Sequence, residues 1–311
     1  MPVFIENKLW QPDVPTVISV GSFDGIHAGH RMIIGKLTEE KQKLHAASLL
    51  FTFDPHPKKV LFPEEEVRLL TVKPEKKELL ENFALDYVLF YPFNREFARM
   101  TGEEFLAFLK SHYRVKKLLL GYNHVFGSDR LADDKIIDKL ARQYGFETER
   151  LPAVEVKGIP VSSTEIKRRL AAYDVRTAND LLGYDYMMFG KVVEGSKFGR
   201  KIGFPTANLQ PLSEDKFIPP DGVYAVYVRW DKDKTGGVMN IGTRPTVDGS
   251  RRLIEVHLLD FEGDLYGDIL KVHFVDFIRP ERRFASVEAL RRRIGEDILK
   301  ARKILEKKFR N

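Results

Sequence analysis

Residues 14–30 decide the first half of the fold, and they read VPTVISVGSFDGIHAGH. The apolar run at residues 14–20 shows little alternation, which is typical of a strand that is buried on both faces. Gly21 and Gly25 follow it and allow the backbone to approach a ligand closely. The stretch therefore predicts a strand, a tight turn and a helix N-terminus near Ala28, where free backbone N–H groups can hold an anion.

The alternation of strand-like and helix-like segments continues through the first half of the chain. Further buried strands are expected at residues 48–53, 87–91 and 117–120. Helices are expected at residues 28–44, 74–83, 101–112 and 133–144. This order predicts an α/β domain, a doubly wound, Rossmann-like parallel sheet with helices on both faces. Ligands of such sheets bind beyond the carboxyl ends of the strands.

The second half has a different pattern, with strand candidates in close succession and turn residues between them. These candidates are residues 223–230, 237–241, 253–261 and 269–277. They predict a small antiparallel β-barrel. A closing helix is expected from Val287, with Ser286 as its N-cap. The sequence thus predicts an α/β domain at residues 1–182 and a β domain with a C-terminal helix at residues 183–311.

The composition narrows the class of protein further. The chain has 311 residues, of which 43% are apolar and 31% are charged, and it has no cysteine. Thiolate metal sites, disulfides and cysteine nucleophiles are therefore excluded. No segment approaches the roughly 20 apolar residues that span a bilayer, and the first residues do not resemble a secretory signal. We expect a cytoplasmic protein without a membrane partner.

His27 and His30 are the first candidate catalytic residues. They are three positions apart, so they share one face of a helical turn. Two imidazoles at a helix N-terminus can donate hydrogen bonds to charge that grows on a phosphorus in a transition state. The alternative is a helix-capping turn that carries two surface histidines.

The motif at residues 21–30 resembles the GxFDGxHxGH signature of bacterial bifunctional riboflavin kinase/FAD synthetases, in their FMN adenylyltransferase module. Residues 52–57 (TFDPHP), 121–127 (GYNHVFG) and 162–167 (SSTEIK) are similar to further motifs of this module, in the same order. The resemblance implies that the FMN phosphate attacks the α-phosphorus of ATP in line. FAD and pyrophosphate are then the products, and no covalent enzyme intermediate forms.

The resemblance also implies the binding residues of this module. ATP would be held by Gly21, Phe23, Asp24, Gly25, His27, His30, Ser162, Ser163, Thr164 and Lys167. The flavin would be held by Phe53, Pro55, His56, Pro57, Asn123 and Phe126. Residues 55–57 could instead form only a rigid loop, and residues 162–164 could be only a helix N-cap. The sequence departs from the family at His124, where Phe is usual, and at Lys167, where Arg is usual.

Residues 190–208 contain a second group of candidate functional residues. Four glycines and the basic side chains among them can surround a polyphosphate with backbone N–H groups and positive charge. Thr206 and Asn208 are two positions apart, so they face one side of an extended segment. Their oxygens are suited to a Mg²⁺ ion that bridges phosphates. A turn-rich entry into the barrel is the alternative for the glycines.

Glu255 is the second candidate catalytic residue. Strand alternation places it with Leu253 and His257 on one face. A carboxylate in an otherwise apolar strand needs a partner or a function, and a general base for a sugar-alcohol hydroxyl would fit there. A structural ion pair with a nearby arginine is the alternative.

Residues 199–208 (GRKIGFPTAN) and 240–246 (NIGTRPT) are similar to the riboflavin kinase signatures of the same family. The family's kinase fold is a six-stranded barrel with a terminal helix. By this resemblance Thr206 and Asn208 bind Mg²⁺–ATP, and Glu255 activates the ribityl 5′-hydroxyl for attack on the γ-phosphorus. The implied ATP-binding residues are Gly195, Lys197, Gly199, Arg200, Gly203, Pro205, Thr206 and Asn208.

The favoured prediction is an enzyme that makes both FMN and FAD, with riboflavin, FMN and ATP as substrates and Mg²⁺ as cofactor. One alternative is a kinase whose adenylyltransferase half is weak or inactive. Another is a flavin-responsive regulator that binds nucleic acid, since residues 184–311 carry 24 Lys and Arg against 19 Asp and Glu. No recognisable nucleic-acid module supports it. We expect no nucleic-acid partner, and a monomer or weak homo-oligomer.

Overall fold

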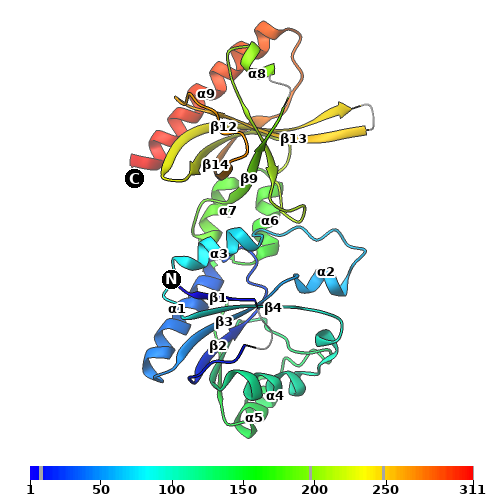
Figure 1. Cartoon of the computed structure of the whole chain (residues 1–311), viewed down its shortest axis with the longest axis vertical. Helices are drawn as coiled ribbons and strands as arrows, with labels where there is room; N and C mark the ends of the chain where they lie inside the picture. The colour runs from blue at the N-terminus through cyan, green and yellow to red at the C-terminus, as the bar shows by residue number, and fades with distance from the viewer. Residues whose placement is uncertain (7–9, 196–197, 247–248, 311) are drawn as a thin grey trace. The chain divides into compact units, whose positions relative to one another are not determined.

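The structure is a computed structural model that describes residues 1–6, 10–195, 198–246 and 249–310. Its contacts divide the chain into two compact units, Met1–Ser162 and Ser163–Asn311. Each unit has its own sheet (Figure 1). No helix in the described part of the chain is long and apolar enough to cross a membrane.

A six-stranded sheet in which every pair is parallel forms the centre of the first unit. Its strands are β1 (Val3–Ile5), β2 (Thr16–Val20), β3 (Ala47–Phe53), β4 (Tyr87–Tyr91), β5 (Val115–Leu120) and β6 (Glu147–Arg150). Their order is β1-β4-β3-β2-β5-β6. The order reverses between β2 and β5, so the predicted doubly wound sheet is confirmed and its topological switch point lies beside β2.

The helices of this unit are α1 (Ala28–Lys43), α2 (Pro57–Leu61), α3 (Lys73–Glu81), α4 (Gly102–Tyr113) and α5 (Asp134–Gln143), with a short 3₁₀ turn at Phe97–Arg99. Helix α2 buries no side chain. A small hairpin of β7 (Glu155–Val156) and β8 (Ile159–Pro160) ends the unit. Thr101 begins α4 with a capping box to Glu104, and Asp133 caps α5 with its carboxylate. Helices α1, α3, α4 and α5 therefore form at the four positions that the sequence predicts.

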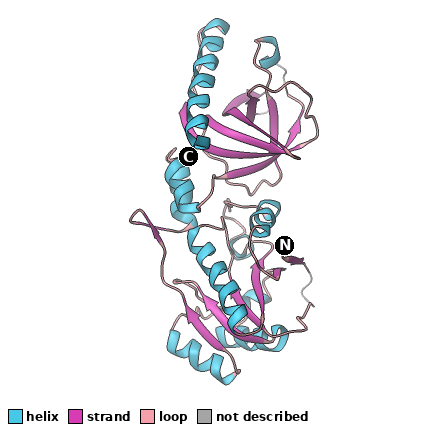
Figure 2. Cartoon of the chain, turned by 90° about the vertical axis from the view of Figure 1, so that its left-hand side faces the viewer, coloured by secondary structure: helices cyan, strands magenta, loops and turns pink. Residues whose placement is uncertain are grey.

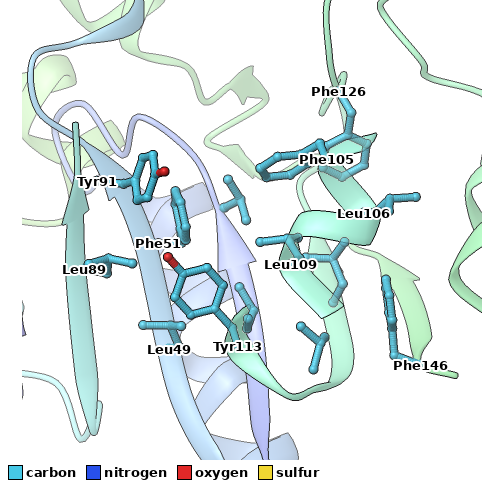
Figure 3. Packing of buried hydrophobic residues seen from close by; sticks show 14 of the residues in the cluster. Leu49, Phe51, Leu89, Tyr91, Phe105, Leu106, Leu109, Tyr113, Phe126 and Phe146 are labelled. Atoms are coloured by element: carbon cyan, nitrogen blue, oxygen red, sulfur yellow. The ribbon is translucent and has the colours of Figure 1, made fainter. Parts of the chain in front are cut away.

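An aromatic core lies between α4, α5 and one face of the sheet (Figure 3). Phe51 of β3 lies at its centre, with ring centroids 5.2 Å from Tyr91 and 5.5 Å from Tyr113. Such ring pairs contribute about 0.5–1.5 kcal/mol beyond their buried area. This core fixes the strands whose carboxyl ends carry the motif loops.

The second unit is a closed antiparallel barrel of six strands in the order β10-β13-β12-β11-β14-β9. Its strands are β9 (Met187–Val193), β10 (Ala207–Pro211), β11 (Gly222–Trp230), β12 (Asp233–Thr246), β13 (Gly249–Leu258) and β14 (Ile269–Pro280). Its helices are α6 (Ser163–Ala171), α7 (Val175–Leu182), α8 (Phe198–Lys201) and α9 (Val287–Arg310). The predicted barrel and C-terminal helix are confirmed. Contacts group α7 with the barrel because it packs on β14.

Helix α9 lies along the outer face of the barrel over β11, β12 and β14 (Figure 2). Val223, Ala225 and Val238 form the apolar surface beneath it, together with Ala301 of the helix itself. Ser286 caps the helix as predicted, since its hydroxyl accepts a hydrogen bond from Ala289 N at 3.1 Å. The helix covers only part of this outer face, and the rest carries the polar side chains described below.

Candidate active sites

Three of the motif loops meet at the carboxyl ends of adjacent strands of the first unit. Residues 21–27 follow β2, residues 54–57 follow β3, and residues 121–127 follow β5. Strand β2 lies between β3 and β5, so the loop with the two histidines occupies the centre. This is the position at which open α/β sheets bind their ligands.

The loop after β2 has a strained backbone that its neighbours hold in place. Phe23, Gly25 and Ile26 have φ values of 46°, 91° and 40°, and such conformations cost about 1–3 kcal/mol each for residues other than glycine. Thr71 holds the loop through two hydrogen bonds. Its hydroxyl accepts a hydrogen bond from Gly25 N, and its backbone N–H donates one to Asp24 Oδ1. Asp24 and Phe23 are buried, so they shape this loop from within.

The two histidines lie together at the start of α1. Their rings are stacked with centroids 3.6 Å apart and planes 16° from parallel. His27 is the N-cap, and its Nδ1 accepts from His30 N at 3.4 Å. A Cβ at Gly29 would lie 3.3 Å from the His27 ring, so glycine allows this close approach. The prediction that the two histidines share one face is confirmed. The alternative of a helix-capping turn is confirmed in part: His27 does cap the helix, but its side chain is buried and not on the surface.

Both histidines are neutral at physiological pH. Burial lowers the pKa of His27 to about 4, although the nearby Asp24 carboxylate opposes this shift. Burial also lowers the pKa of His30 well below its usual value, and the electrostatic effects of the adjacent His27 and Lys76 act in the same direction. Because His27 Nδ1 accepts a hydrogen bond, its proton resides on Nε2. That N–H is a neutral donor for an anionic ligand.

The predicted flavin residues occupy different environments. Asp54 and Pro55 are joined by a cis peptide bond, and the His56 ring caps α2 by accepting from Lys58 N. Phe53 and Pro57 are neighbours of this turn, and Asn123 is exposed in the loop after β5. Phe126, in contrast, is buried and packs on Phe105 with ring centroids 5.6 Å apart. A flavin-binding role for these residues stays a prediction.

Residues 162–167 lie at the division between the two units. Ser162 ends the first unit, whereas Ser163, Thr164 and Lys167 belong to α6 in the second. Helix α6 begins at Ser163, which agrees with the alternative interpretation that residues 162–164 mark the start of a helix. Their role in ATP binding stays a prediction.

His124, the first departure from the family pattern, behaves as an aromatic side chain. Its ring lies 4.5 Å from that of Phe126. Burial and, to a smaller extent, the adjacent Arg150 guanidinium lower the pKa of His124 to about 4. Arg150 also donates to the Gly121 and His124 carbonyls, at 2.7 and 3.2 Å, and so holds the loop.

We expect His124→Phe to reduce the acid sensitivity of the fold. A histidine whose folded pKa is about 4 and whose unfolded pKa is about 6.5 loses its contribution to stability as the pH falls between these values. Phenylalanine has no such loss. Thermal unfolding of both proteins at pH 7 and pH 5 measures the difference. An equally steep loss of Tm in the variant and the wild type would contradict the prediction.

The second unit aligns three polar side chains in a row across its barrel. Asn208 of β10 pairs with Glu255 of β13, and Glu255 pairs with Asn240 of β12. Directly paired residues project from the same face of a sheet. Asn240 in turn pairs with Val223, which lies under α9, so the row lies on the outer face of the barrel.

The alternation predicted around Glu255 is confirmed. Leu253, Glu255 and His257 are half-buried, whereas the side chains between them are buried. His257 also holds the entrance of β10, since its Nδ1 lies 2.8 Å from the Pro205 carbonyl oxygen. Glu255 thus lies between two amide side chains on a partly open surface.

Two glycines of the glycine-rich loop lie close to Asn208 and to the segment that precedes it. A Cβ at Gly195 would lie 2.0 Å from Asn208 Nδ2, and one at Gly199 would lie 2.4 Å from the Phe204 carbonyl oxygen and 3.2 Å from Thr206 Oγ1. Glycine permits these close approaches, so the backbone at Gly195 lies against Asn208 and the backbone at Gly199 lies against Thr206. Lys197 lies outside the described residues.

Two further predicted residues and one unpredicted residue border the loop. Arg200 is exposed on α8, and Gly203 has a φ of 85° that favours glycine. A Cβ at Gly203 would lie 3.9 Å from Arg291 Nη2. Arg291 was not among the predicted site residues, because the proximity of α9 to this loop is not visible in a local sequence pattern.

Thr206 and Asn208 suit a metal ion that arrives with a nucleotide. They offer a hydroxyl and an amide oxygen, which are hard neutral ligands. In the described part of the chain no group of three or more His, Asp or Glu side chains could hold a metal by itself. The donor set therefore fits Mg²⁺ whose remaining ligands come from phosphate and water.

We expect Gly195→Ala to impair the barrel site without unfolding the barrel. The new methyl group would displace the flexible Asn208 amide rather than backbone, and misplacing a positioning group by about 1 Å can cost on the order of 100-fold in rate. The rate of the riboflavin phosphorylation that the sequence predicts for this unit is the measurement. Gly295→Ala is the matched control, because that helical glycine has nothing within 4 Å of its Cβ position. Equal rates in both variants would refute the prediction.

Known proteins match both units of the chain. A family model described as riboflavin kinase matches residues 182–305, and one described as FAD synthetase matches residues 11–165. A curated Escherichia coli (strain K12) relative is named "Bifunctional riboflavin kinase/FMN adenylyltransferase". It is 39% identical over 96% of this chain and 95% of its own length. A Pseudomonas fluorescens relative of the same name is 38% identical over 92% of both chains.

A solved structure from Streptococcus pneumoniae has the same fold over nearly the whole chain. The TM-score is 0.87 with 30% sequence identity, and the match covers 97% of this chain and 98% of that one. Its title names a macrolide-efflux protein. Neither family model points to that activity.

Proposed function

The chain belongs to the bifunctional riboflavin kinase/FMN adenylyltransferase family, and we propose which of its residues carry the two reactions. The enzyme phosphorylates riboflavin to FMN and adenylylates FMN to FAD. A monofunctional kinase is not favoured, because family models match both units and the relatives' names contain both activities. The kinase match lies in the barrel unit and the synthetase match covers the parallel-sheet unit.

In the kinase reaction, Glu255 is the proposed general base. Its carboxylate accepts the proton of the ribityl 5′-hydroxyl as that oxygen attacks the γ-phosphorus, and ADP leaves. The observation that carries this proposal is the row of Asn208, Glu255 and Asn240, with Gly195 of the glycine-rich loop against Asn208. The flanking amides can orient the carboxylate and a hydroxyl, and a positioned base contributes about 10²–10⁴-fold to the rate.

In the adenylyl reaction, an FMN phosphate oxygen attacks the α-phosphorus of ATP and pyrophosphate leaves. His27 and His30 are the proposed donors of neutral N–H groups to the charge that builds up on the phosphoryl oxygens. Their stacking at the N-terminus of α1, beside the switch point of the sheet, supports this role. Neutral donors have one advantage here: they need no counter-charge when the site is empty.

Mg²⁺ is the proposed cofactor, held by Thr206 and Asn208 in the kinase site. The ion would neutralise phosphate charge and orient the γ-phosphate. The chain's own part is to present two neutral oxygens, which leave the charge of the ion available to the nucleotide. We further propose the cytoplasm as the compartment, since both reactions consume ATP, and a monomer or weak homo-oligomer as the assembly.

A chromatographic product assay tests the function directly. Purified protein is incubated with ATP and either riboflavin or FMN, with Mg²⁺ or with EDTA in its place. We expect FMN and FAD from riboflavin, FAD from FMN, and neither product in EDTA. FMN without any FAD would leave only the kinase, and full activity in EDTA would refute the metal proposal.

A further inference from the structure

Lys76 is a buried cation behind the loop that carries the two histidines. It lies on α3 and is 6% exposed, although its neighbours Lys73 and Lys77 reach solvent and pair with Glu6. Its Nζ donates to the Ser22 carbonyl oxygen at 2.7 Å. A buried ammonium group is costly unless it has a partner or a function, and this one contacts the backbone of the loop.

The Ser22 carbonyl receives a second hydrogen bond from another element. Thr52 Oγ1 of β3 donates to the same oxygen at 3.2 Å, so α3 and β3 fix one peptide group together. The next residue, Phe23, has a φ of 46°, a conformation that a free chain rarely adopts. The orientation of this peptide is therefore imposed by the surrounding donors.

This orientation decides which groups of the loop face the ligand. In a trans peptide the carbonyl and the following N–H point in opposite directions. Strand β3 lies on one side of β2 and β5 on the other. Because the Ser22 carbonyl points to Thr52 and Lys76, the Phe23 N–H points away from both of these side chains. The switch-point crevice lies on the other side of β2, next to β5, and an anion there needs N–H groups and would be repelled by a carbonyl oxygen.

The charges around Lys76 are consistent with a cation that persists at neutral pH. Burial lowers the pKa of Lys76 to about 8, while the Asp24 and Asp54 carboxylates oppose that shift. Lys76 in turn helps to lower the pKa of His30. One side chain thus acts on both the backbone and an imidazole of the same loop.

We infer that Lys76 is a positioning residue for adenylyl transfer: it holds the Ser22 carbonyl away from the nucleotide phosphates and turns the Phe23 N–H toward them. The inference rests on the proposed role of this loop in the adenylyl reaction. Lys76 forms no bond to substrate and transfers no proton.

The test uses Lys76→Met, which retains most of the side-chain length but removes the charge and the N–H donors. We expect the kcat of FMN adenylylation to fall about 10- to 100-fold, as for a misplaced positioning group, with a smaller change in the KM for ATP. Riboflavin phosphorylation by the same chain should stay at the wild-type rate, which reports that the barrel unit is folded, and thermal unfolding reports whether the first unit is folded as well. Lys77→Met, a change of the exposed neighbour, is the control for both rates.

Thr52→Val provides an independent test through the same carbonyl oxygen. It removes the second donor at nearly constant volume, and we expect a smaller loss of the same kcat. If Lys76→Met does not fold, this variant decides the question alone. Wild-type adenylylation kinetics in a folded Lys76→Met or in Thr52→Val would overturn the inference, as would a lower Tm without a lower kcat. Absence of FAD synthesis in the wild-type protein would instead refute the proposed function.

Discussion

Glu255→Gln is expected to abolish FMN formation from riboflavin while FAD formation from FMN continues. The substitution retains the size of the side chain and its place between Asn208 and Asn240 in the barrel. It removes the oxygen that accepts the hydroxyl proton, and loss of a general base costs about 10²–10⁴-fold in rate. Product chromatography with riboflavin and then with FMN as the starting flavin measures both activities in one preparation.

Glu262→Gln is the control for this experiment, because Glu262 is an exposed glutamate in the turn after β13. It should leave both rates unchanged. If Glu255→Gln eliminates both activities, the assignment of one reaction to each unit is wrong. If it eliminates neither, Glu255 has the alternative role of a structural carboxylate.

The sequence predicts the elements whose local pattern matches their final environment. Strands β2 to β5 are short apolar runs because parallel strands in the middle of a sheet are buried on both faces. Strands β1 and β6 were not predicted, because they lie at the edges of the sheet and have no long apolar run. Strand β1 has only three residues, and β6 has the sequence Glu-Thr-Glu-Arg. Strand β10 contains Asn208, Gln210 and Pro211, so its pairing depends on barrel closure rather than on its own composition.

The sites were predictable where spacing alone brings residues together. His27 and His30 meet because they are three positions apart at a helix start, and Glu255 faces outward because strands alternate. The pairing of Glu255 with Asn208 and Asn240 depends on the register of β10, β13 and β12. Register is a non-local property that no single segment encodes.

The signal for Lys76 was present in the sequence but was not used. The buried positions of α3 and its N-cap are Val72, Glu75, Lys76, Leu79 and Leu80. They follow the i, i+3, i+4, i+7, i+8 spacing of an inward-facing stripe. Two charged residues on such a stripe indicate buried polar contacts, whereas Lys73 and Lys77 lie off it. A search for charges at stripe positions would have distinguished Lys76 from its neighbours.

The second large effect is expected from His30→Ala, which should reduce FAD formation from FMN and leave FMN formation intact. The ring of His30 is stacked on His27 and meets Phe23 edge-on at 5.1 Å. Its removal deletes one neutral N–H donor and the ring that packs against His27 and Phe23. Loss of a single donor to a transition-state oxyanion costs about 10²–10³-fold in kcat, and the kinetics of pyrophosphate release measure it.

Two further variants separate catalysis from folding in the test of His30. His45→Asn changes an exposed histidine in the turn after α1 and should have wild-type rates, since asparagine tolerates the φ of 46° at that position. His30→Gln retains an N–H donor and should recover part of the rate that alanine loses. Because burial holds the pKa of His30 well below its usual value, its contribution should not change between pH 6 and 8. Equal losses in the alanine and glutamine variants would assign the ring a packing role, and a wild-type rate in His30→Ala would remove it from the mechanism.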